Sequence, residues 1–297
     1  MQDLIRHPPF FPNPAPQEGG SRIKSGMTVL SRGRALYHQR VNRPTQLLRD
    51  RHLLDGGVDV MARDGRQVAA LMRVLFELAE TSKARRSVTP LMEFVIGNMT
   101  ASMSRFSDAK VACGRGCYFC CHIWVDATPP ELLHLARSLT GERRAAVLRA
   151  VQAALEKTGG LTVEQRARFV HPCPMLVDKA CSVYEARPLA CRALAALDAR
   201  TCERAFVHLS DELIDVPQPY ILAGYGYRLA LDGALKRAGL IYRPVELNSG
   251  LAVALTHAAA ENDWLAGADP FTAAQRPPPN DPFDDPNARA LYALAFG

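Results

Sequence analysis

The sequence predicts a mainly α-helical fold with little or no β-structure, arranged around an irregular, cysteine-rich core. Apolar residues recur at steps of three and four along several stretches of the 297-residue chain, which is the period of an amphipathic helix. Alternating strand patterns are scarce and no internal repeat is evident. Seven of the eight cysteines fall in two groups. Any strands should therefore be short and close to these cysteines.

Two helices are expected before the first cysteine group. The first is indicated by an apolar stripe at helical spacing, formed by Val68, Leu71, Met72, Leu75, Phe76 and Ala79. The second should begin at Thr89, because Pro90 then occupies the first helical position, where its missing N–H is tolerated. It should continue through Met99 towards the cysteines.

Further helices are expected after the first cysteine group. Thr128 followed by two prolines and Glu131 is typical of a helix start, with the threonine as cap and the glutamate completing a capping box. Pro172 and Pro174 force the residues before them into extended conformations, so the second cysteine group should begin in a loop. The other periodic stretches predict helices over 142–157, 162–170, 189–208, 221–238, 245–260 and 287–296.

Five segments are predicted from these patterns and from the placement of the prolines. They are a disordered or loosely packed tail at 1–26, an N-terminal helical region at 27–108, a cysteine-cluster domain at 109–205, a C-terminal helical region at 206–265 and a proline-rich tail at 266–297.

The composition is that of a soluble globular protein with a basic surplus. The net charge is +6 and the pI is about 9.0, but the basic residues are dispersed and form no run of five or more. Nucleic acid is therefore not expected as a partner. No signal peptide or membrane span is evident, so we expect a cytoplasmic protein without a membrane partner. Cysteines in that reducing compartment indicate metal or redox chemistry rather than structural disulfides.

Seven cysteines are the candidate metal ligands: Cys113, Cys117, Cys120, Cys121, Cys173, Cys181 and Cys191. Thiolates bind soft and borderline ions strongly, and a tetrahedral site takes ligands from several directions. In a regular helical turn the first three would share one face, and Cys121 would lie roughly 100° around from Cys120. The glycines at 114 and 116 suit a backbone that approaches an ion closely.

The remaining candidates near the cysteine groups are interpreted differently. Cys202 lies eleven residues after Cys191, and ~16 Å along the axis of a continuous helix, so it is interpreted as a buried thiol rather than a ligand. His122 and His171 each flank a cysteine group. Either could complete a metal site, but bonding to the backbone or to water is slightly favoured.

The stretch at 109–205 resembles the YkgJ-like cysteine-cluster family, described as a zinc- or iron-chelating domain. The resemblance rests on Cys113-x3-Cys117-x2-Cys120-Cys121, on Cys173-Pro174-Met175-Leu176 and on the segment from Cys181 to Arg192 with its Tyr-Glu-x-Arg-Pro. It departs from the family at Tyr118, where relatives often carry glycine. A similar cluster occurs in a protein-lysine methylase, and this resemblance implies that a protein or peptide could be a partner.

Two arginines are expected to bind the cofactor. An anionic thiolate cluster needs positive charge and N–H donors nearby, which Arg187 and Arg192 could supply. Their alternative role is that of surface residues beside a turn. No catalytic residue can be named from the sequence.

Two ligation schemes fit the cysteines. One [4Fe–4S] cluster takes four of them and leaves three for stability or a second ion. Two zinc ions need about eight ligand positions, which seven cysteines and one histidine would fill. The spacing favours iron–sulfur. A match of residues 113–120 to the radical-SAM fingerprint is not favoured, because strands are scarce and another cysteine follows directly.

Three functions follow from these schemes. The first is a metal-binding protein that holds an iron–sulfur cluster, or iron, for redox chemistry or electron transfer. The alternatives are an iron-dependent enzyme that modifies proteins or peptides, and an interaction module stabilised by zinc. Whether the chain is an enzyme at all stays open at this stage.

Overall fold

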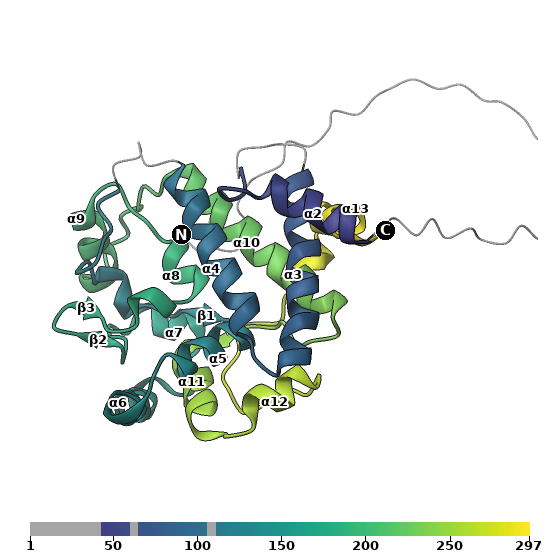
Figure 1. Cartoon of the computed structure of the whole chain (residues 1–297). Coiled ribbons are helices and arrows are strands. Elements are labelled where there is room, and N and C mark those ends of the chain that lie inside the picture. Colours follow the sequence, from purple (N-terminus) through teal and green to yellow (C-terminus); the bar gives the residue numbers. More distant parts are fainter. Residues whose placement is uncertain (1–42, 60–64, 106–110) are drawn as a thin grey trace, which may run out of the picture.

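The computed structural model describes residues 43–59, 65–105 and 111–297, and the expected mainly α-helical fold is confirmed (Figure 1). The tail expected at 1–26 lies outside the described residues. The α-helices are α2 (Arg43–Leu53), α3 (Arg66–Arg85), α4 (Thr89–Ser104), α5 (Pro129–Arg137), α6 (Gly141–Thr158), α7 (Val163–Ala167), α8 (Leu189–Ala193), α9 (Ala199–Cys202), α10 (Gln218–Arg237), α11 (Leu247–Thr256), α12 (Ala260–Leu265) and α13 (Pro286–Phe296).

Short elements connect these helices. The 3-10 turns are η1 (Phe119–His122), η2 (Tyr184–Ala186) and η4 (Pro282–Asp284), and a π-helical turn, η3, follows α9 at Glu203–Val207. The strands are β1 (Asp126–Ala127), β2 (Leu176–Val177), β3 (Ala180–Cys181) and β4 (Val245–Glu246). They pair antiparallel as β1 with β4 and β2 with β3, so the β-structure is minor, as expected.

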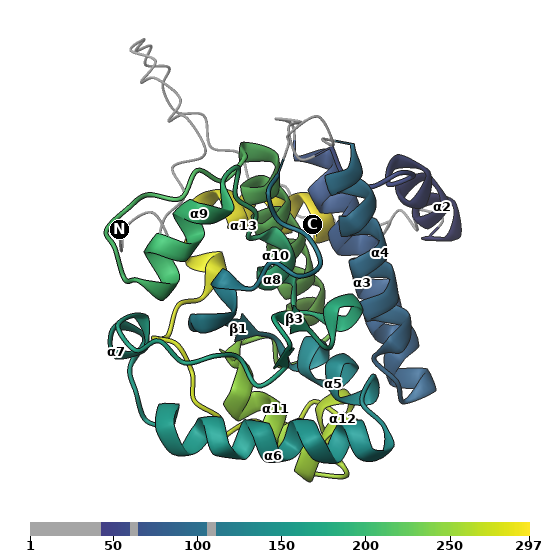
Figure 2. The same cartoon turned by 90° about the vertical axis from the view of Figure 1, so that its left-hand side faces the viewer.

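Helix α3 lies at the centre of the larger helical layer. It packs against α10, α4, α2 and α13, which lie beside it in Figure 1. Its predicted apolar stripe is confirmed, because Leu71, Met72 and Leu75 are fully buried. Helices α5, α6 and α11 pack together at the other end of the molecule (Figure 2). Both layers contribute to one continuous apolar core, and none of the described helices is long and apolar enough to cross a membrane.

The predicted start of α5 is confirmed in detail. Thr128 is the N-cap and has an extended backbone. The Glu131 carboxylate accepts hydrogen bonds from the Thr128 N–H, at 2.7 Å, and from the Thr128 hydroxyl, at 2.5 Å. The predicted helices over 142–157, 221–238 and 287–296 are also present, as α6, α10 and α13. Within the stretch expected to be a proline-rich tail, Phe271 and Phe283 are buried in the core.

The helix predicted over 189–208 is wrong. Helix α8 ends at Ala193, the chain then runs extended, and a new helix starts only at Ala199. Contacts with distant residues explain the break: the Ala196 N–H donates to the Cys113 Sγ at 3.2 Å, and the Leu197 N–H donates to the Asp215 carbonyl at 3.1 Å. These N–H groups would otherwise bond within the helix.

Two further helix predictions need correction at their ends. The stretch 162–170 is helical only over Val163–Ala167, and the chain beyond it turns towards the second cysteine group. The stretch 245–260 opens with strand β4, and α11 ends at Thr256 before α12 begins. Strand β4 forms because Val245 and Glu246 pair with β1, an interaction between residues more than 100 positions apart that a local pattern does not carry.

Candidate metal centre

All seven candidate cysteines line a single cavity of about 570 Å³. Each is half-buried, and none forms a disulfide. They come from four segments: the loop and η1 turn of the first group, the loop after α7, strand β3 and helix α8. These segments face the viewer in Figure 2. Residues separated by up to 78 positions are thus brought together, as the sequence analysis expected.

The first cysteine group does not form a regular helical turn, contrary to the expectation. Gly116 adopts φ +97°, a conformation that favours glycine, and the Cys117 N–H closes a turn on the Gly114 carbonyl at 3.0 Å. The short η1 turn then begins at Phe119, so only Cys120 and Cys121 lie in it. The first three cysteines therefore reach the cavity from a loop and a 3-10 turn, rather than from one helix face.

The second cysteine group is joined directly to the first. The Cys173 N–H donates to the Cys121 carbonyl at 2.7 Å, which fixes two candidate ligand segments side by side. Cys181 lies in strand β3 opposite Leu176 of β2. The hairpin between these strands turns at Asp178 and Lys179, which both have positive φ. This tight turn brings Cys181 back close enough to Cys173 to raise its pKa.

Arg166 links the same two cysteine groups through hydrogen bonds to backbone carbonyls next to them. This buried arginine of α7 donates to the His122 carbonyl at 2.9 Å, to the His171 carbonyl at 2.9 Å and to the Phe169 carbonyl. His122 follows the first group immediately and His171 precedes Cys173 by two residues. The guanidinium fork can serve several acceptors at once because its donors point in fixed directions.

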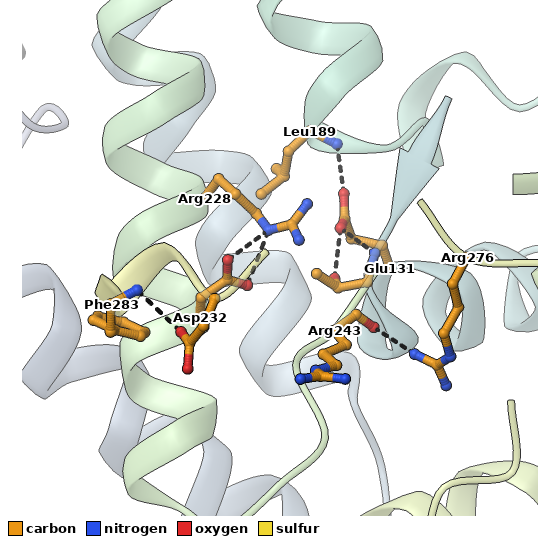
Figure 3. Close-up of polar contacts among 9 residues, drawn as sticks. Glu131, Leu189, Arg228, Asp232, Arg243, Arg276 and Phe283 are labelled. Carbon is orange, nitrogen blue, oxygen red and sulfur yellow. Dashed lines mark hydrogen bonds and ion pairs between the residues drawn. The ribbon is translucent and has the colours of Figure 1, made fainter. Parts of the chain in front are cut away.

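Glu131 positions the short helix that carries Cys191. While one carboxylate oxygen caps α5, the other accepts the Leu189 N–H at 2.7 Å, at the start of the short helix that carries Cys191. Figure 3 shows the Arg228 guanidinium between the carboxylates of Asp232 and Glu131. The Arg228 Nε lies 2.9 Å from both oxygens of Asp232, so Glu131 is set in a buried, charge-compensated network.

Burial in the cavity disfavours the thiolate form of several candidate ligands. Burial raises the pKa of Cys173 and of Cys191 to about 12 each, and it also raises the pKa of Cys181. The pKa of Cys120 is raised first by a hydrogen bond with the Cys121 thiol and then by burial. Thiolates form in such a place only when positive charge, or a metal ion, compensates for the loss of water.

One family model matches the part of the chain that carries the candidate cysteines. Residues 112–210 match the family model CxxCxxCC, whose description is "Putative zinc- or iron-chelating domain". Residues 112–210, about a third of the chain, are called the CxxCxxCC domain below after the model that they match. Neither the curated proteins nor the solved structures contain a match to the chain. The family description supports metal binding, and the match agrees with the cysteine-cluster family that the sequence resembles.

Arg187 and Arg192 both line the cavity of the CxxCxxCC domain, but they are engaged differently. Arg192 donates to the carbonyls of Arg187, at 3.1 Å, and Glu185, and burial lowers its pKa to about 10. Arg187 stacks on the ring of Tyr184 at 3.6 Å, and its Nε is buried with no hydrogen-bond partner. Arg187 also lowers the pKa values of Cys120, Cys181 and Cys191, although burial outweighs it.

Three other residues near the cysteine groups are absent from the described lining of the cavity. His122 Nδ1 contacts the Phe119 carbonyl at 3.1 Å, and His171 Nδ1 contacts the Pro172 carbonyl at 3.0 Å. Cys202 is buried, as expected. The continuous helix that was to separate it from Cys191 is broken, and Cys202 instead packs close enough to the first cysteine group for those thiols to raise its pKa further.

The donor set of the domain fits a thiophilic metal group, while the present spacing of the donors does not fit a single ion. Within residues 43–59, 65–105 and 111–297, no group of three or more His, Cys, Asp or Glu side chains is arranged to hold a metal ion. Seven thiols nevertheless face one cavity, and the orphaned Nε of Arg187 is a donor suited to anionic sulfur. Binding must therefore draw the thiols together or fill the space between them.

The positioning roles of Arg166 and Glu131 in this domain were not predicted from the sequence. Arg166 was not singled out, because its partners are three backbone carbonyls that no residue pattern marks. Glu131 was recognised only as a helix cap, since its second partner, Leu189, lies 58 residues away. Arg166 lies between the two cysteine groups in the sequence. A prediction that this arginine is buried would have been the one signal of its positioning role.

Proposed function

We propose that the CxxCxxCC domain holds an iron–sulfur cluster through its cysteine thiolates and serves redox chemistry or electron transfer. The observation that carries this proposal is the cavity lined by seven cysteines from four separate segments. Cys120, Cys173, Cys181 and Cys191 are the preferred ligands, because all four line the cavity and each lies close enough to at least one of the others for one thiol to raise the other's pKa. Cys113 and Cys117 form a second, coupled pair on an exposed loop.

The spacing of the thiols favours a cluster over a single zinc ion. A tetrahedral zinc at about 2.3 Å from its sulfurs needs those sulfurs only about 3.8 Å apart. The described residues contain no trio arranged for one ion, although the thiols share a cavity. A cluster carries its own sulfides and so spans a wider set of cysteines. The arrangement supports the larger group.

The chain's own residues would stabilise such a group electrostatically. Arg187 presents a buried, unpartnered Nε in the cavity wall and is held against Tyr184. N–H donors and positive charge near cluster sulfurs stabilise the more reduced, more negative state. When bound, the cluster supplies reversible one-electron chemistry; Arg187 and the burial of the thiols set the potential at which it operates.

Anaerobic purification tests this function. Iron and acid-labile sulfide should be present in equal amounts, with a visible spectrum that bleaches on reduction. Cys191→Ser should lose most of this iron, whereas Cys202→Ser, the matched buried cysteine outside the cavity, should keep it. Stoichiometric zinc without sulfide would overturn the redox function.

A further inference from the structure

The proposed function leaves Cys113 and Cys117 without a task. Both thiols line the cavity, but a [4Fe–4S] cluster takes only four cysteines, and four others are its preferred ligands. The two lie at either end of the loop 113–117, and residues 114–116 of this loop are exposed. A free cysteine that only fills core space behaves as a small buried apolar residue. These two are instead half-buried neighbours in a cavity wall.

The backbone of this loop brings the two thiols into contact. Gly116 has φ +97°, and the Cys117 N–H donates to the Gly114 carbonyl at 3.0 Å, which closes a tight turn directly after Cys113. The thiols of Cys113 and Cys117 share a hydrogen bond across this turn. A pair of thiols in contact is the starting geometry for a disulfide, whose sulfurs lie about 2.05 Å apart.

Contacts with two other segments position the loop. At its start, the Ala112 N–H donates to the Ala196 carbonyl at 2.8 Å, and the Ala196 N–H donates to the Cys113 Sγ at 3.2 Å. At its tip, the exposed Arg115 pairs with Glu185 at 2.8 Å. The bond to sulfur has a chemical consequence, because a donor aimed at sulfur stabilises negative charge on it. Cys113 is therefore the better placed of the two thiols to act as a nucleophile.

The approach to this pair is open. Among the described residues, a Cβ added at Gly114 or at Gly116 would meet no atom within 4 Å. The turn thus carries no side chain next to either thiol, and a molecule from solvent can approach the pair. Accessibility separates thiols that exchange from inert buried ones. The neighbouring thiol of Cys202, which is 4% exposed, lacks such access.

We propose that Cys113 and Cys117 form a dithiol that reduces low-molecular-weight disulfides by exchange. The Cys113 sulfur attacks one sulfur of the substrate disulfide, a mixed disulfide forms, and the departing thiolate takes up the proton that Cys113 releases. Cys117 then attacks the Cys113 sulfur, which forms the internal disulfide, and the proton of Cys117 passes to the second departing thiolate. Two electrons thus move from the dithiol to the substrate, and no other reductant is consumed.

The order of the two steps follows from the surroundings of each thiol. Burial raises the pKa of Cys117, so its attack relies on the high effective concentration of the adjacent mixed disulfide. The exchange itself needs no electron from the cluster. The dithiol rests on the proposed function only in that the cluster takes its ligands elsewhere, which leaves both thiols free.

Glutathione disulfide is the probe, added to anaerobically purified, full-length protein that has been freed of small thiols. Released glutathione is followed over time, and the disulfides formed are located by peptide mapping after the remaining thiols are alkylated. Iron and sulfide are determined on the same samples. We expect each protein to consume one glutathione disulfide and to form one internal disulfide, between Cys113 and Cys117.

Three variants assign the steps. Cys113→Ser should release glutathione at least tenfold more slowly than wild type, because the attacking sulfur is gone. Cys117→Ser should stop at a mixed disulfide on Cys113. Cys202→Ser, the matched buried cysteine, should exchange as wild type does. All three should keep their iron.

The outcomes separate the dithiol from the cluster. Protein that holds iron and sulfide but releases no glutathione overturns the dithiol and leaves the cluster in place. Loss of iron from Cys113→Ser or Cys117→Ser, as from Cys191→Ser, also overturns it, because these thiols are then ligands. An internal disulfide between Cys113 and Cys202 contradicts the pairing. Protein that lacks iron and sulfide but exchanges through Cys113 and Cys117 supports the dithiol and contradicts the proposed function.

Discussion

Replacing Arg166 with methionine should loosen the join between the two cysteine groups. Methionine keeps much of the buried apolar contact but cannot donate to the carbonyls of His122, Phe169 and His171. A hydrogen bond that involves a charged group contributes about 1.5–3 kcal/mol. Burial opposes this gain, as shown by the lowered pKa of Arg166. We therefore expect a net loss of about 3 kcal/mol, below the sum of three such bonds.

The same change should weaken metal binding. The carbonyls released by Arg166→Met belong to residues beside Cys121 and Cys173, so the ordering of both segments must then come from the metal itself. If about 2 kcal/mol of the loss is transferred to binding, the affinity for the metal falls roughly 30-fold. Urea unfolding of metal-free protein measures the stability, and competition with a chelator measures the affinity.

Arg144 provides the matched control for this prediction. It also joins two segments, by donating to the carbonyls of Ala136 at 3.1 Å and Leu255 at 2.8 Å, but it contacts neither cysteine group. Arg144→Met should lower stability and leave metal affinity within threefold of wild type. If both variants lose metal equally, or if Arg166→Met keeps wild-type affinity, the positioning role of Arg166 is refuted.

Three further predictions concern the same cavity. Glu131→Gln should destabilise the fold by about 2 kcal/mol and lower metal occupancy, because an amide N–H₂ must then face a buried donor. Gly224→Ala should lower the free energy of unfolding by about 1–3 kcal/mol and reduce metal binding, because its Cβ would lie 2.5 Å from the Ala193 side chain of α8. Gly226→Ala is the control: the nearest atom to its Cβ would be 3.9 Å away, so this change should be neutral or stabilising. Metal affinity should rise with pH from 6 to 9, because Cys173 and Cys191, with pKa values of about 12, must release protons on binding.

Simple measurements check these three. Thermal unfolding and metal analysis test the first two, and unchanged occupancy in Glu131→Gln or equal effects of the two glycine variants would contradict them. For the third, calorimetry in two buffers of different ionisation enthalpy counts the protons released. Each thiol that ionises adds up to a tenfold gain in affinity per pH unit. An affinity independent of pH would show that the buried thiols are not ligands.

The helices could be predicted where local chemistry decides them. Thr128 and Glu131 cap α5 within four residues of sequence, so the start of that helix follows from the pattern. The break after Ala193 could not be predicted, because the Ala196 N–H bonds to Cys113, 83 residues away. The alanine-rich pattern there is compatible with a helix, and a long-range partner overrides it.

The candidate site, like the helices, could be predicted from the sequence only in part. Cysteine spacing was sufficient to predict that seven thiols converge, since few other arrangements account for so many in one chain. The loop path of Cys113 and Cys117 depends on Gly116 at φ +97°, and two glycines in a sequence do not specify which one turns the chain. Asn248 lies 57 residues beyond the last ligand candidate, in an ordinary apolar helix pattern, and only the packed structure places it in the cavity.

The most direct test of the account is X-ray absorption at the metal edge of protein purified without oxygen. The account predicts a first coordination shell of sulfur alone, at about 2.3 Å, with iron as a second neighbour. Loss of that signal in Cys191→Ser, but not in Cys202→Ser, would assign it to the cavity. A first shell of nitrogen and oxygen, or a protein that binds no metal while fully folded, would contradict it.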